Sequence, residues 1–182
     1  MVKLDVPLIP QQEEFYCVPA CIKMVMEYLN SSGMLRVPLP TLELREIARV
    51  VKTSDGTLAH NVPLINPRLD AAVPSVEFED EYRSRIIHEI EEEHLRGLPC
   101  IPWMLLTDGV HFTHHAVVIT DIDRDLNRIT YNDPGPPRET TQPLSAFETV
   151  WARAQTTLVK LQIGKKTRTV LTQFTEGRAN ES

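Results

Sequence analysis

Cys17 is the residue whose position in this sequence most favours nucleophilic chemistry. It opens a run with apolar side chains at helical spacing, and Pro19 fits the first turn, where its missing N–H costs nothing. A cysteine there faces unpaired backbone N–H groups and the positive end of the helix dipole, which favour the reactive thiolate. Gln11, six residues upstream, can donate its amide N–H to an oxyanion formed beside the sulfur. Cysteines on helices are more often small core residues, so this position needs support from elsewhere in the chain.

The second half of the chain supplies a candidate base and a candidate group to orient it. A thiol nucleophile needs a base, and the base in turn needs an orienting partner. Residues 114–123 and 127–133 are predicted to be two strands joined by a short hairpin-like connection. If they pair, His115 at the start of one strand comes beside Asp133 at the end of the other, and Asp133 can accept the imidazole N–H. Because side chains alternate along a strand, His114 points to the opposite face.

These residues resemble a known family when taken together. Gln-x5-Cys-x-Pro-Ala at a helix start, His before an apolar strand and Asp-Pro after the next strand are similar to the papain-like cysteine peptidases, and most similar to the bacteriocin-processing, double-glycine-peptidase-like group. The resemblance runs from about residue 6 to about residue 163. It implies an α+β fold in which the cysteine-bearing helix packs on an antiparallel sheet, with a cleft between them.

The resemblance also implies roles for individual residues. Cys17 matches the nucleophile, His115 the base, Asp133 the orienting acid and Gln11 the oxyanion donor. Asn132 is the alternative orienter, since some papain relatives use Asn. The family usually has Gly after the cysteine, where this chain has Val18, which narrows the space expected beside the thiolate. The implied activity is that of a thiol peptidase, or a related acyl hydrolase or transferase, acting on a peptide or protein substrate.

Two other classes of function are kept open. The first is a non-enzymatic module that retains the cleft and holds an extended peptide. The second is a zinc-binding protein, since histidine and cysteine side chains are common zinc ligands. The zinc candidates are His111, His114, His115, Cys17 and Cys21. Their spacing differs from the i, i+4 helix spacing of zinc peptidases, so this pattern is the weaker one.

Composition limits the remaining possibilities. The 182 residues are 42% hydrophobic and 24% charged, as in an ordinary globular protein. The formal charge is −6, and the sequence lacks a basic stripe interleaved with aromatic residues, so nucleic-acid binding is not expected. No apolar run is long enough to span a bilayer, so no membrane partner is expected. Three cysteines, an odd number, favour a reducing compartment, and we expect a cytoplasmic protein without a cofactor. The sequence leaves the oligomeric state open.

The chain is predicted to form one domain over residues 1–163, followed by a polar tail over 164–182. The acidic run Glu91–Glu93 is predicted to be a solvated helix face, Cys100 a core residue, and Phe147 and Trp151 a packing pair. A Pro-Gly-Pro-Pro segment, 134–137, is expected to break the chain. The predicted elements are an extended arm or edge strand over 4–9; helices over 17–30, 41–52 (with Thr41 as N-cap), 81–96 and 143–154; a loop with one short helix over 53–74; and strands over 74–80, 98–106, 114–123, 127–133 and 156–163.

Overall fold

The structure is a computed structural model that describes residues 3–71, 76–81, 87–107 and 109–164. Helices and antiparallel strands are mixed along the chain, which confirms the α+β prediction. In chain order the elements are α1 Cys17–Ser31, α2 Leu44–Val50, the 3₁₀ helix η1 Ala59–Ile65, α3 Asn66–Asp70, β1 Val76–Glu81, α4 His88–Leu95, β2 Ile101–Thr107, β3 Phe112–Ala116, β4 Val118–Asp123, β5 Arg128–Pro134, β6 Pro137–Pro143, α5 Leu144–Arg153 and β7 Leu158–Ile163.

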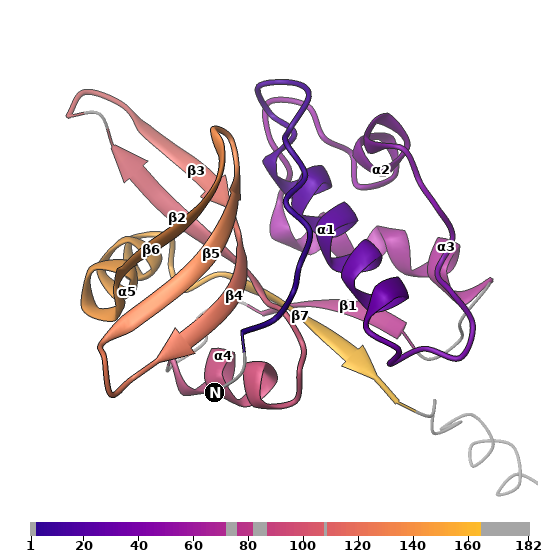
Figure 1. The fold of residues 1–182 in the computed structure, drawn as a ribbon. Coiled ribbons are helices and arrows are strands. Elements are labelled where there is room, and N and C mark those ends of the chain that lie inside the picture. The colour runs from indigo at the N-terminus through magenta and orange to yellow at the C-terminus, as the bar shows by residue number, and fades with distance from the viewer. Residues whose placement is uncertain (1–2, 72–75, 82–86, 108, 165–182) are drawn as a thin grey trace, which may run out of the picture.

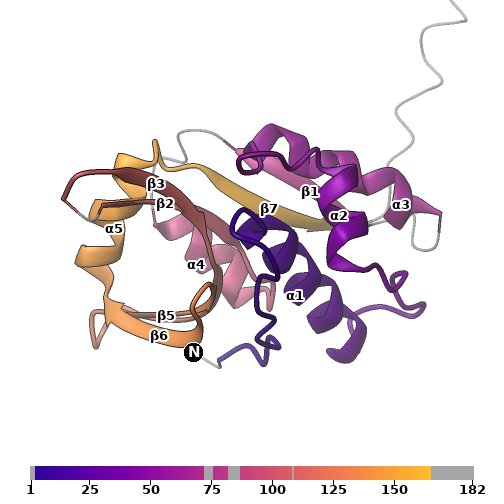
Figure 2. The same ribbon diagram turned by 90° about the horizontal axis from the view of Figure 1, so that it is seen from above.

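The strands form two sheets. One has the order β1-β7-β2-β3 and the other the order β4-β5-β6, and all the pairings within both are antiparallel. Figures 1 and 2 show α1, α2 and α3 on one side of the molecule, and β4, β5, β6 and α5 on the other. The strand β7 runs from the α5 side to the α3 side, so the first sheet connects the two halves.

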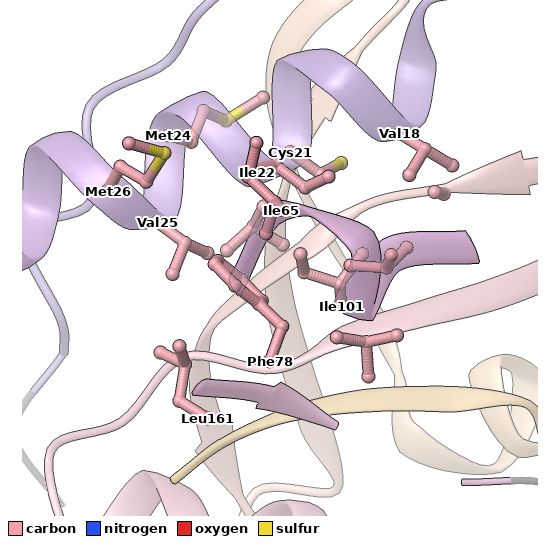
Figure 3. Packing of buried hydrophobic residues seen from close by; sticks show 14 of the residues in the cluster. Val18, Cys21, Ile22, Met24, Val25, Met26, Ile65, Phe78, Ile101 and Leu161 are labelled. Atoms are coloured by element: carbon pink, nitrogen blue, oxygen red, sulfur yellow. The ribbon is translucent and has the colours of Figure 1, made fainter. Parts of the chain in front are cut away.

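The helix α1 lies at the centre of one hydrophobic core. Eleven of its fifteen residues are buried, so it is covered on more than the single face of an ordinary surface helix. Ile65, Phe78, Ile101 and Leu161 lie beneath α1 in Figure 3, so η1, β1, β2 and β7 all pack in this core. We call this set of buried side chains the first cluster. A second cluster is formed mainly by β4, β5 and α5, and it contains the stacked pair Phe147 and Trp151, as predicted, with ring centroids 6.0 Å apart.

The prediction of one strand over residues 114–123 is wrong, because the chain changes sheets at Val117. It leaves the first sheet at the end of β3 and enters the second sheet at the start of β4. Side chains on this passage alternate between the two cores: Ala116 and Val118 belong to the first cluster, and Val117 and Ile119 to the second. Residues 116–119 are therefore buried on both faces, and we call this segment the shared wall of the two clusters.

The strand β6 was not predicted. The segment 134–137 was expected to break the chain, but Pro134 pairs with Pro137, and the two residues between them form a tight hairpin turn. Both prolines stand at the ends of their strands, where a missing backbone donor is tolerated. β6 is an edge strand that is mostly exposed, so the sequence offers no alternating apolar pattern by which to find it.

The prediction that the acidic run on α4 is solvated is also wrong for two of its residues. Glu91 is 5% exposed and Glu93 is 7% exposed. Each has a cationic partner: Arg124 forms an ion pair with Glu91, and Arg96 donates to Glu93 at 3.0 Å. Arg124 comes from the connection between β4 and β5, far from α4 in sequence, so helix spacing alone could not indicate this burial.

The N-terminal arm and α2 differ in detail from the predictions. The arm is extended and donates from Leu4 N–H to the Thr120 carbonyl at 2.8 Å without forming a regular strand. The prediction that Thr41 is the N-cap of a helix over 41–52 is wrong: α2 is Leu44–Val50, and its N-cap position is Glu43, which makes no side-chain capping bond. Leu39 and Leu42 precede the helix and are buried in the first cluster. The predicted start of the 81–96 helix and the tail fall largely outside the described residues, which omit 82–86 and 165–182.

No helix in the described parts of the chain has the length and apolar character needed to cross a membrane.

Candidate active site

Cys17 is the first residue of α1, as the sequence predicts. The N-cap residue Tyr16 has no side-chain capping bond, and the first intrahelical bond runs from Ala20 N–H to the Tyr16 carbonyl at 3.0 Å. The N–H groups of Cys17 and Val18 therefore have no acceptor within the helix. Cys17 is 9% exposed, which is less than the partial exposure expected of a reactive thiol. The side chain of Val18 is buried in the first cluster.

His115 lies near the end of β3, and its imidazole faces Asp133 on β5. The distance between His115 Nε2 and Asp133 Oδ1 is 2.7 Å, and both side chains are largely buried. The two residues belong to different sheets, and the change of sheet at Val117 brings them together. His114 is exposed, as alternation along the strand requires.

The charges at this site favour a protonated imidazole beside an ionised carboxylate. Burial lowers the pKa of His115, but hydrogen bonds to Asp133 and Cys17, together with their negative charges, raise it to about 9. Burial raises the pKa of Asp133, but hydrogen bonds from His115 and the Gly135 N–H outweigh this effect and lower it. Because Nε2 is held by Asp133, Nδ1 is the ring nitrogen left for the Cys17 thiol.

Gln11 is held against the β5–β6 turn. Its backbone N–H donates to the Pro134 carbonyl at 2.9 Å, and its side-chain Nε2 donates to the Glu14 carbonyl at 2.9 Å. An amide NH₂ carries two hydrogens, so this bond leaves one donor of Gln11 for another acceptor. The arm that carries Gln11 is fixed at a second point, where Asn132 Nδ2 donates to the Val6 carbonyl at 2.8 Å. Asn132, the alternative orienter, therefore serves the arm, and Asp133 is the residue that contacts the imidazole.

The other two cysteines are core residues, as predicted. Cys21 and Cys100 are fully buried, and burial raises the pKa of both thiols. Among residues 3–71, 76–81, 87–107 and 109–164, no group of three or more His, Cys, Asp or Glu side chains is placed to hold a metal ion. The zinc alternative therefore finds no support in the geometry.

A cavity of about 420 Å³ lies away from these residues. Its lining includes Lys3, Asp5, Tyr28 and His94, but not Cys17, His115 or Asp133. A hollow of this kind is a common ligand site, but the nucleophile, base and acid of the predicted chemistry are elsewhere. The candidate active site is therefore the group formed by Cys17, His115 and Asp133, apart from this cavity.

Gly135 is the site residue that sequence reasoning missed. Its backbone N–H donates to Asp133 Oδ1 at 2.9 Å, the same oxygen that faces His115. From sequence alone, the Pro-Gly-Pro-Pro segment predicts only a break in the chain. The signal that was available is the position of a glycine two residues after the candidate acid, where a backbone can turn back toward a carboxylate.

Comparison with known proteins places the chain in a family. A crystal structure of a proposed C39-like peptidase from Bacillus anthracis matches with a TM-score of 0.65 and 15% sequence identity, and the match covers 88% of this chain and 98% of that one. At this identity the likeness shows a shared fold. No curated protein matches. The family model described as the Peptidase_C39 like family matches residues 3–159, and the chain therefore belongs to that family of papain-like, C39-type cysteine peptidases.

Proposed function

We propose that the protein is a cysteine peptidase, or a closely related acyl hydrolase or transferase, with Cys17 as the nucleophile. The observation that carries the proposal is the contact of 2.7 Å between His115 Nε2 and Asp133 Oδ1, which leaves the other ring nitrogen for the thiol at the start of α1. This is the nucleophile, base and orienter relation that thiol catalysis requires.

The first half of the reaction is acyl transfer to sulfur. The Cys17 thiolate forms a bond to the carbonyl carbon of a peptide, and the carbonyl π electrons move to the oxygen. The Cys17 backbone N–H and the free amide hydrogen of Gln11 stabilise this oxyanion. When the carbonyl re-forms, the C–N bond breaks, and the His115 imidazolium gives its proton to the leaving amine. With a pKa of about 9, His115 is protonated at neutral pH and can serve as this acid.

The second half releases the acyl group. Neutral His115 takes a proton from a water molecule as its oxygen bonds to the thioester carbon. The C–S bond then breaks, and the products are a carboxylic acid and the original pair of thiolate and imidazolium. If an amine takes the place of water, the same residues perform transfer rather than hydrolysis. Asp133 keeps the imidazole oriented in both halves and remains ionised, in keeping with its lowered pKa.

The test is brief treatment with substoichiometric iodoacetamide at neutral pH, followed by peptide mapping. Cys17 should be alkylated first, because it keeps 9% of its surface exposed, whereas Cys21 and Cys100 are enclosed (0% and 1%) and burial raises the pKa of both thiols. Hydrolysis of fluorescein-labelled casein, and acylation by p-nitrophenyl acetate, should be lost in Cys17→Ala, while the thermal midpoint changes little because a small side chain is replaced by another.

Two outcomes would overturn the proposal. One is preferential labelling of Cys21 or Cys100, and the other is unchanged turnover in Cys17→Ala. Slow labelling of Cys17 together with casein binding but no cleavage would favour the peptide-binding module instead.

A further inference from the structure

The turn between β5 and β6 contacts both the candidate acid and the candidate oxyanion donor. Gly135 N–H donates to Asp133 Oδ1 at 2.9 Å, and that oxygen is 2.7 Å from His115 Nε2. One residue earlier, the Pro134 carbonyl accepts from the Gln11 N–H at 2.9 Å. Two consecutive residues, Pro134 and Gly135, thus contact Gln11 from the N-terminal arm and the carboxylate of Asp133 on β5.

The side chain of Gln11 occupies the space that a side chain at position 135 would need. A Cβ built on Gly135 would lie 2.5 Å from Gln11 Cδ, 2.6 Å from its Oε1 and 3.0 Å from its Cγ. Among the described residues, Gln11 Oε1 is buried without a hydrogen-bond partner, so packing against the turn, and not a bond through this oxygen, fixes that end of the amide.

The backbone of Gly135 does not itself require glycine. Its φ lies outside the left-handed region, unlike the φ of Gly33, Gly56, Gly97 and Gly109. A left-handed φ is therefore not the reason for glycine at position 135, and the reason that the structure shows is the close approach of Gln11.

We propose that Gly135 is a positioning residue for acyl transfer, which sets the place of the Gln11 amide and, through its N–H, the place of the Asp133 carboxylate. This proposal rests on the function proposed above and adds to it the residue that aligns the oxyanion donor with the acid and base. An added Cβ must push Gln11 away by roughly 1 Å to reach an ordinary contact, and a displacement of that size can cost on the order of 10² in rate.

The test compares two reactions of the same sulfur. Acylation of Cys17 by p-nitrophenyl acetate passes through an oxyanion, whereas its alkylation by iodoacetamide does not. In Gly135→Ala, the N–H to Asp133 remains but Gln11 is displaced. We therefore expect acylation of Cys17 to be slower in Gly135→Ala by about tenfold or more. Alkylation of Cys17 should stay within about twofold of the native rate at every pH at which the two rates are compared.

A double variant separates positioning from general damage. Gln11→Ala removes the three atoms that lie nearest to the new Cβ, so adding Gly135→Ala to it should cause no further loss of acylation. The double variant should also regain any thermal stability that Gly135→Ala loses, which keeps the test informative if the single variant folds poorly. Gly164→Ala is the matched control, because a Cβ there meets nothing within 4 Å, and it should acylate at the native rate.

Failure of the role proposed for Gly135 and failure of the proposed function would give different results. Native acylation in Gly135→Ala, or losses that multiply in the double variant, would refute the role of Gly135 while leaving Cys17 chemistry intact. If the native protein is acylated no faster than Cys17→Ala, the proposed function falls, and the role of Gly135 falls with it.

Discussion

The pKa of His115 offers a quantitative test of the site. The rise from the ordinary value of 6.5 to about 9 corresponds to roughly 3 kcal/mol in favour of the protonated ring. Since burial acts in the opposite direction, the contacts with Asp133 and Cys17 must supply more than this amount. Asp133→Asn keeps the shape of the side chain but removes its charge. We expect the pKa of His115 in this variant to fall from about 9 toward 6.5.

The direct assay is an NMR titration of carbon-13-labelled histidine from about pH 5 to about pH 10, the range that covers both pKa values. The His115 signal is identified by its absence in His115→Gln. Turnover should report the same change, because the leaving amine needs a protonated imidazole: the alkaline limb of the rate profile should move to lower pH in Asp133→Asn.

Asp121→Asn is the matched control. Asp121 lies on β4, and its Oδ1 is 3.6 Å from His94 Nε2, so this variant removes a carboxylate beside a different histidine. The His115 titration should be unaffected by it. A His115 that still titrates near 9 in Asp133→Asn would refute the electrostatic account of the site.

The same ionisation makes stability depend on pH. Because the pKa of His115 is higher in the folded state, the stabilisation is fully present below pH 6.5 and is lost as pH rises through about 9. The pKa of Asp133 is lowered in the folded state, so its contribution is present above its ordinary value of 3.8 and is lost as pH falls below that value. Denaturant unfolding at a series of pH values measures both slopes, and Asp133→Asn should flatten them.

Three further substitutions test other parts of the structure. Gln11→Ala should lower acylation of Cys17 on the order of 10² to 10³, the usual loss of one oxyanion donor, and unchanged kinetics would exclude this residue from the mechanism. Asn132→Ala leaves the Val6 carbonyl without its 2.8 Å donor and should lower the free energy of unfolding by about 1–3 kcal/mol, which denaturant titration would detect. Phe147→Ala should cost about 3–5 kcal/mol because Phe147 is fully buried; Phe112→Ala, at a residue that is 69% exposed, should cost little, and equal effects in the two would contradict this packing.

The local features of this fold were predictable from sequence, whereas the contacts between distant segments were not. α1 was found because apolar spacing, a first-turn proline and a stop signal agree over fifteen residues. The change of sheet at Val117 was missed because a strand buried on both faces has a continuous apolar run and no alternation to show where it turns. The proximity of His115 and Asp133 was expected from pairing within one sheet, but it arises at the junction of two.

The burial of Glu91 and the packing of the β5–β6 turn could not be predicted from sequence for a related reason. Glu91 on α4 is buried beside Arg124, which comes from the connection between β4 and β5, and no local pattern around Glu91 encodes that partner. Likewise, the side chain of Gln11 fills the space beside Gly135 where a Cβ would lie, and the two residues are separated by most of the chain. Such requirements become visible only when the segments are brought together.

The shared wall between the two clusters has a consequence for how the molecule can come apart. Ala116 and Val118 complete the core around α1, and Val117 and Ile119 complete the core around α5, so the same four consecutive residues close both. Excising either half would expose to water one apolar face of residues 116–119. Loosening one core would likewise remove side chains against which the other core packs. The two halves should therefore unfold in a single cooperative transition, and a fragment that ends on either side of the wall should not fold by itself.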